Sequence, residues 1–160
     1  DPQEHLPPLF GKGRRNLVVV RRARHAPELA LFSAARRRHG PFDLTLIEAG
    51  AYDKQWEGVH MLPEQVIQAH RDLRGEWLLP IHNATYDLAF HAWDEPLEKM
   101  LSLAAVNDVR LTMPRIGEPV LLGQHQAATP WWRERKADDA LMSRANVGRW
   151  SARLQKVCAR

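Results

Sequence analysis

The chain has 160 residues, of which 44% are hydrophobic and 26% charged, as is typical of a soluble globular domain. Its single cysteine, Cys158, excludes an internal disulfide framework and zinc motifs built from cysteine pairs. No apolar run approaches the roughly 20 residues that a membrane helix needs. The chain opens without an initiator Met or an apolar leader, which suggests a fragment or a processed chain. We expect a cytoplasmic location, with peripheral membrane attachment as the alternative.

The net charge of +4 comes largely from arginine clusters. They lie at residues 14–15, 21–24 and 36–38 and in the tail after residue 133. A basic chain can bind nucleic acid, but no recognised binding motif accompanies these arginines. The sequence therefore does not favour a nucleic-acid partner.

Strand-like and helix-like segments alternate along the chain. β-branched or apolar runs predict strands, and proline at the start of an apolar-periodic segment predicts a helix. The expected order is strand 16–20, helix 27–39, strand 43–47, helix 63–74, strand 77–81, a helix from Pro96, and strands 109–113 and 118–122. This alternation predicts an α/β layered fold.

The sequence also predicts how the chain is organised into domains. With no internal repeat or linker, we expect residues 1–160 to form one domain, although the signal is weaker over the tail, residues 124–160. There, Trp131 and Trp132 are candidates to cap the core, and residues 138–144 could form a short helix.

The stretch from Pro80 to Pro96 is the strongest candidate for a functional site. Its His82 directly follows an apolar strand, and Tyr52 follows the preceding strand. The carboxyl ends of parallel strands meet at one edge of a sheet, where ligands bind. Imidazole is a common zinc ligand, so His82 is either a metal ligand or a hydrogen-bonded loop residue.

Four motifs in order give a resemblance to a known family. They are Gly-Pro-Phe-Asp-Leu at 40–44, Gly-Ala-Tyr-Asp at 50–53, His-Met-Leu-Pro-Glu-Gln at 60–65 and Ile-His-Asn-Ala-Thr-Tyr at 81–86. Together they resemble the C-terminal half of the metallo-β-lactamase fold, in the branch of N-acyl-phosphatidylethanolamine-hydrolysing phospholipase D and its bacterial relatives. The similarity is strongest over residues 34–122.

The resemblance implies half of an αββα sandwich, with a mixed sheet and helices packed on it. The complete family site holds two zinc ions, and His82 occupies a ligand position. Pro-Gln-Glu-His at residues 2–5 resembles another ligand motif, which makes His5 a candidate. Tyr52 and His60 either line the substrate cleft or pack beneath it.

Other family ligands are missing from this sequence. The His-x-His-x-Asp-His signature is absent, and residues 24–28 lack the aspartate that bridges the family's metals. We therefore expect a zinc-dependent hydrolase, phosphodiesterase-like or lactonase-like, that binds metal at most partially and is inactive as this isolated chain. Its substrate would be a small-molecule or lipid-like ester. The alternative is a non-catalytic half-domain, and in either case an uncovered sheet face predicts self-association.

Overall fold

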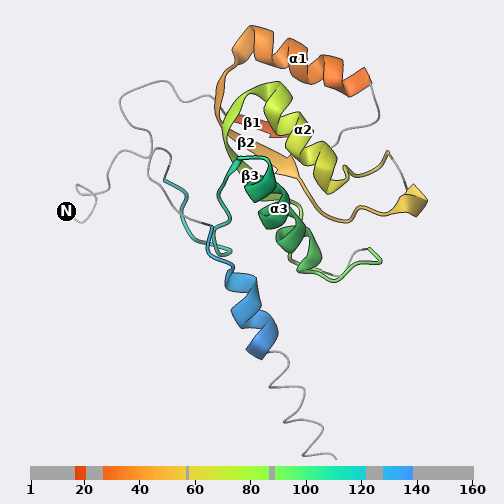
Figure 1. Ribbon diagram of the computed structural model, residues 1–160, viewed down its shortest axis with the longest axis vertical. Coiled ribbons are helices and arrows are strands. Elements are labelled where there is room, and N and C mark those ends of the chain that lie inside the picture. The colour runs from red at the N-terminus through yellow and green to blue at the C-terminus, as the bar shows by residue number, and fades with distance from the viewer. Residues whose placement is uncertain (1–16, 21–26, 57, 87–88, 122–127, 139–160) are drawn as a thin grey trace, which may run out of the picture. The chain divides into compact units, whose positions relative to one another are not determined.

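A computed structural model describes residues 17–20, 27–56, 58–86, 89–121 and 128–138 (Figure 1). The chain divides into two compact units, Asp1–Ala128 and Thr129–Arg160. The first unit holds the sheet and its helices. In the second unit, residues 131–138 are helical.

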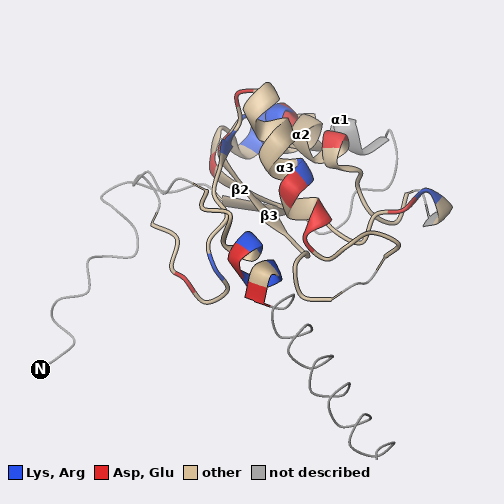
Figure 2. Ribbon diagram, turned by 60° about the horizontal axis from the view of Figure 1, so that its bottom comes forward, with Lys and Arg blue, Asp and Glu red and all other residues tan. Residues whose placement is uncertain are grey.

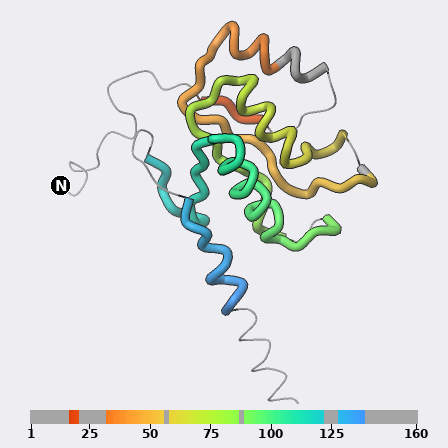
Figure 3. Tube along the Cα trace, in the orientation of Figure 1, coloured from red at the N-terminus to blue at the C-terminus, as the bar shows by residue number. Residues whose placement is uncertain are grey.

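The first unit is built on a parallel sheet whose strand order follows the chain. The strands are β1 Leu17–Val20, β2 Phe42–Glu48, β3 Gly75–Ile81 and β4 Arg110–Leu111. The connections carry α1 Pro27–His39, α2 Pro63–Leu73 and α3 Glu95–Val106, and a 3₁₀ turn, η1 Lys54–Trp56, precedes α2. Figure 3 shows the same path as a tube along the Cα trace, coloured from the N-terminus to the C-terminus. The α/β class predicted from the sequence is confirmed, and the described strands are all parallel rather than mixed.

The helices lie side by side over one face of the sheet (Figure 1). On that face Thr45, Leu78 and Leu111 occupy neighbouring strands in register and are buried. Removing this apolar area from water drives the packing of helices on sheet. Figure 2 marks the charged residues along α2 and α3 on the ribbon.

Local sequence explains where α2 begins and ends. Pro63 fits the first helical position, where no backbone donor is needed. The Gln65 side chain accepts a hydrogen bond from the Leu62 amide at 2.7 Å, which satisfies a donor at the helix start. The helix stops at Arg74, whose φ of 53° is left-handed. These signals place the start of β3 directly after α2.

A buried imidazole ties α2 to the sheet. His70 Nδ1 lies 2.7 Å from Thr45 Oγ1 on β2, and burial lowers the pKa of His70 to about 4. Gly75 lies against this pair, since a Cβ there would come within 2.6 Å of His70 Nδ1. The interior at this point has room only for glycine.

The opposite face of the sheet is apolar and only partly covered at its edge. Leu17 and Val19 of β1 are 44% and 53% exposed. They alternate with Val18 and Val20, so they point away from the helix layer. The predicted self-association through this face remains a prediction.

The sequence predicted a strand at 118–122 and a short helix at 138–144 near the end of the chain. Residues 118–121 do not join the sheet, so the predicted strand 118–122 is wrong over this stretch. Pro119 lacks the amide donor that a ladder requires. The short helix expected at 138–144 falls almost wholly outside the described residues. Among the described helices, none is long and apolar enough to cross a membrane.

Candidate metal centre

Two adjacent strands deliver the first residues of the candidate site. Glu48 ends β2 and pairs in register with Ile81, the last residue of β3. The Ala49 amide donates to the Ile81 carbonyl at 2.9 Å, which extends the pairing past the strand ends. His82 is the next residue, so Glu48 and His82 emerge at the same edge of the sheet, as the strand-end rule predicts.

The third residue, His60, comes from the loop between η1 and α2. Its Nδ1 lies 3.2 Å from Glu48 Oε2, and its ring stacks on the His82 ring with centroids 5.2 Å apart. The Met61 amide contacts the other Glu48 oxygen at 3.4 Å. One ligand atom from each of Glu48, His60 and His82 lies within 4.8 Å of the others.

Exposure increases across the cluster from inside to outside. The Glu48 side chain is 2% exposed and the His60 side chain 17% exposed, while His82 is open to solvent. A buried carboxylate is costly unless it is paired, and Glu48 finds its partners in His60 and the Met61 amide. Two imidazoles and a carboxylate are ligands that zinc accepts.

The backbone around His82 is held in an unusual conformation. His82 has a φ of 63°, and the neighbouring Ala51 and Ala84 have φ values of 57° and 62°. Each such residue costs on the order of 1–3 kcal/mol, and residues of this kind cluster at functional sites. Gly50 permits a close approach between the two loops, because a Cβ there would lie 2.2 Å from the His82 carbonyl oxygen.

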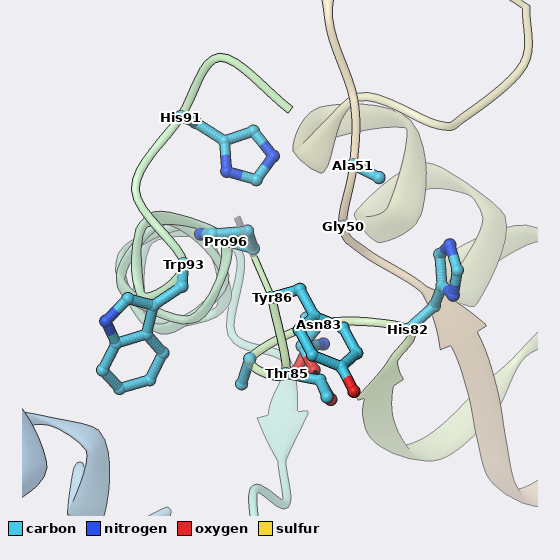
Figure 4. Close-up of a pocket in the computed structure, with 10 residues that line it drawn as sticks. Gly50, Ala51, His82, Asn83, Thr85, Tyr86, His91, Trp93 and Pro96 are labelled. Carbon is cyan, nitrogen blue, oxygen red and sulfur yellow. Dashed lines mark hydrogen bonds between the residues drawn. The ribbon is translucent and has the colours of Figure 1, made fainter. Parts of the chain in front are cut away.

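A cavity of about 310 Å³ opens beside His82 (Figure 4). It lies between the loop after β2 and the loop that joins β3 to α3. Its lining includes Gly50, Ala51, His82, Asn83, Tyr86, His91 and Trp93. In Figure 4 the His91 ring points toward the Ala51 side of the cavity, while Trp93 points away from it.

Tyr52 packs on His91, which lines this cavity, but is not itself among the lining residues. It is 6% exposed, its hydroxyl donates to Glu95 Oε1 at 3.2 Å, and its ring packs on His91 with centroids 4.6 Å apart. Lys99 pairs with the same Glu95 oxygen at 2.7 Å. Burial raises the pKa of Tyr52 to about 12. This geometry suits a residue that positions His91, whereas direct contact of Tyr52 with substrate remains a prediction.

The structure brings together two of the four candidate site residues predicted from the sequence. His60 and His82 meet in the cluster, where His60 is placed as a potential ligand in addition to its predicted role at the substrate. His5 lies outside the described residues, so its role remains a prediction. Sequence reasoning missed Glu48, although a carboxylate ending the strand next to the His82 strand was a usable signal.

Comparison with known proteins gives partial matches. Residues 17–83 match the beta-lactamase superfamily domain. An uncharacterized protein of Mycobacterium tuberculosis is 41% identical over 98 residues, which is 59% of this chain and 26% of that protein. The outer membrane protein RomA of Klebsiella pneumoniae is 43% identical over 51 residues, 32% of this chain and 39% of that protein.

A further relative carries an enzymatic name. N-acyl-phosphatidylethanolamine-hydrolyzing phospholipase D 1 of Caenorhabditis elegans is 31% identical over 75 residues. The match covers 45% of this chain and 21% of that protein. The chain thus spans about a quarter of the length of the mycobacterial relative and less than half of the others.

Proposed function

Because the chain belongs to the metallo-β-lactamase fold superfamily through residues 17–83, we propose that it carries part of the metal centre of a zinc-dependent hydrolase. The observation that carries this proposal is the cluster of Glu48, His60 and His82, whose ligand atoms lie within 4.8 Å of one another. No other such group occurs among the residues that the structure describes.

The donor set fits zinc. Catalytic zinc sites use three protein ligands and leave a position open, and two histidines with a glutamate are one of the known combinations. The exposure of His82 leaves one side of the cluster accessible to solvent. His5 is proposed as a further ligand because of its resemblance to the family motif.

Glu48 can serve this site in either of two ways. It can coordinate the metal through one carboxylate oxygen. Alternatively, it can accept the Nδ1–H of His60, as the 3.2 Å distance allows, so that His60 presents Nε2 to the metal. Carboxylates that orient a ligating histidine in this way also raise metal affinity.

Zinc at this position would lower the pKa of a bound water toward neutrality and polarise the scissile group. The chain's own residues would hold the ligands in place and provide room for the substrate. Glu48 holds the His60 ring, and the cavity beside His82 offers a place for substrate. We propose a lipid-like or phosphodiester substrate, supported by the phospholipase name of one relative, with a lactone as the alternative.

We further propose that these 160 residues are inactive in isolation. The His-x-His-x-Asp-His signature, which supplies the first metal's ligands in the family, is absent from the sequence. A non-catalytic half-domain is the second candidate function. The exposed apolar side chains of Leu17 and Val19 favour it, because such a face suits contact with another folded segment.

Zinc binding by the 160-residue chain tests the proposal. The unaltered chain should retain about one zinc per chain after dialysis, measured by mass spectrometry of the metal. His82→Ala and His60→Ala should each abolish retention. His39→Ala is the matched control, because His39 is an exposed imidazole at the end of α1, and it should retain zinc as the unaltered chain does. Equal retention in all four proteins would overturn the proposed centre.

Catalytic competence is tested separately with an activated phosphodiester, bis(p-nitrophenyl) phosphate. The zinc-loaded chain should hydrolyse it no faster than free zinc at the same concentration. Chelator-sensitive turnover by the chain alone would show that the site is complete without the missing signature, and would contradict the half-domain alternative.

A further inference from the structure

We propose that the cavity beside His82 is a subsite for an uncharged, compact apolar group of the substrate, namely the group that lies next to the reacting ester bond. The inference deepens the proposed function and rests on it for the position of that bond. Binding of such a group is a property of the cavity alone, so it can be measured without metal.

The cavity adjoins the candidate metal centre through one shared residue. His82 belongs both to the cluster of possible ligands and to the lining of the cavity. Figure 4 shows His82 and His91 at opposite sides of this lining, with the backbone of Gly50 and Ala51 between them. A substrate whose reacting bond lies at the cluster can therefore place the neighbouring group in the cavity.

The side chains of the lining decide which charge this group can carry. Among the described residues of the lining, the ionisable side chains are those of His82, Tyr86 and His91, and none is Lys, Arg, Asp or Glu. Ordinary imidazole and phenol groups are uncharged at pH 8. A buried charge without a partner is costly, so the cavity disfavours a phosphate, a carboxylate or an ammonium group. The charged part of a phosphodiester would then lie at the metal, and the cavity would hold an uncharged part.

The volume of the cavity limits the size of the group. A cavity of about 150 Å³ in a protein interior can bind benzene. The cavity beside His82 has a volume of about 310 Å³, roughly twice as large, which is room for about two fused rings. Ala51, Trp93 and Pro96 contribute apolar surface to the lining. Removal of apolar area from water would drive the binding.

The walls of the cavity are held in place by contacts within the chain. Ala51 has a left-handed backbone with a φ of 57°. Gly50 lies so close to the opposite loop that an added Cβ would clash with the His82 carbonyl oxygen. The His91 ring packs on Tyr52, with centroids 4.6 Å apart. A cavity formed before the ligand arrives reduces the entropy lost on binding.

Three probes that share a naphthalene ring system test the charge of the group. They are naphthalenemethanol, which is neutral, naphthoate, which is an anion, and naphthalenemethylamine, which is a cation at pH 8. Binding to the ¹⁵N-labelled 160-residue chain is followed by chemical-shift titration at pH 8 with a chelator present, so that metal plays no part. We expect the neutral probe to bind about tenfold more tightly than either charged probe. The shifted amides should map to residues 50–51, 82–86 and 91–93.

Benzyl alcohol, a smaller neutral probe, tests the size of the group. Because the cavity has room for both fused rings, naphthalenemethanol should bind about tenfold more tightly than benzyl alcohol. Ala51→Leu enlarges a side chain of the lining and should remove most of this difference. Ala105→Leu makes the same change at an exposed position of α3 and should preserve the difference.

The outcomes separate the subsite from the metal centre. The subsite would be overturned if a charged probe bound as tightly as naphthalenemethanol, if the two neutral probes bound equally, or if the shifts were confined to other surfaces. A size preference that Ala51→Leu leaves intact would also overturn it. If Ala51→Leu loses its dispersed amide spectrum, the comparison of the four probes on the unaltered chain still decides. Failure to retain zinc, with the probe affinities as expected, would overturn only the metal centre.

Discussion

Glu48 and His60 are joined by a hydrogen bond of 3.2 Å between Oε2 and Nδ1, across 12 residues of sequence. Glu48 ends a buried strand, and His60 lies in the loop that leads to α2. The bond gives the buried Glu48 carboxylate a partner, without which its burial would be costly. It also holds the His60 imidazole in place beside His82. The proposed metal centre depends on this relationship.

Replacing the carboxylate by its amide tests that dependence. Glu48→Gln keeps the shape of the side chain but removes its charge. We expect zinc affinity to fall about 10- to 100-fold, measured by competition with a chromophoric chelator. Glu64→Gln removes the same charge at an exposed position in the first turn of α2 and should leave the affinity unchanged. Equal affinities for the two variants would show that Glu48 takes no part in binding.

The close approach of the two site loops makes a second prediction. In Gly50→Ala the added Cβ would lie 2.2 Å from the His82 carbonyl oxygen, so the loops must separate. We expect a loss of about 1–3 kcal/mol in the free energy of unfolding, together with weaker zinc binding.

Gly117→Ala is the matched comparison for that variant. Gly117 has a φ of 90° and no atom within 4 Å of an added Cβ. It should lose about 1 kcal/mol for conformational reasons alone and bind zinc normally. Urea unfolding and zinc competition distinguish the two. Normal zinc binding by Gly50→Ala would contradict the role of this contact in placing His82.

Because His70 is buried, we expect the chain to become less stable as the pH falls. Its pKa is about 4 in the folded chain against an ordinary value of 6.5. Between those values the unfolded chain binds a proton that the folded chain does not, so the free energy of unfolding falls as the pH drops from 6.5 to 4. The loss is on the order of 3 kcal/mol at most.

Urea unfolding at pH 7 and pH 4.5 measures this effect. His70→Gln should be less stable at pH 7 but should lose less stability on acidification than the unaltered chain. His39→Gln replaces an exposed imidazole and should keep the full acid dependence. The same acid dependence in both variants would assign it to other groups.

The fourth prediction concerns the hydroxyl of Tyr52 and its effect on stability. Tyr52→Phe removes its bond to Glu95 and should cost about 0.5–1.5 kcal/mol of stability. Because the pKa of Tyr52 is raised to about 12, absorbance at 295 nm should show a tyrosine ionising near that pH in the unaltered chain. That component should vanish in the variant. Its persistence would show that Tyr52 is not the buried tyrosine.

Much of the fold was predictable because local signals agree with tertiary packing. Pro63 and the spacing of Val66, Ile67, His70 and Leu73 predict α2, and the structure buries these residues. The helix 27–39 predicted from Pro27 and the Gly40-Pro41 stop also matches α1. The predicted strand 118–122 failed over its described residues, where Pro119 lacks the amide donor that pairing in a sheet requires.

The site was less predictable than the fold. His82 was found because strand order alone places it at the edge where ligands bind. The meeting of Glu48 with His60 depends on the path of the loop between β2 and α2, which no periodicity encodes. The cavity beside His82 likewise depends on loop conformation, including left-handed residues that are not glycine.

X-ray absorption at the zinc edge of the zinc-loaded chain tests the central claim most directly. We predict nitrogen and oxygen ligands at about 2.0–2.2 Å, without sulfur, and outer-shell scattering from at least two imidazoles. His60→Ala, which should not retain zinc, should give no such spectrum. Zinc bound to His60→Ala with an unchanged spectrum, or a sulfur ligand in the unaltered chain, would contradict a zinc site formed by Glu48, His60 and His82.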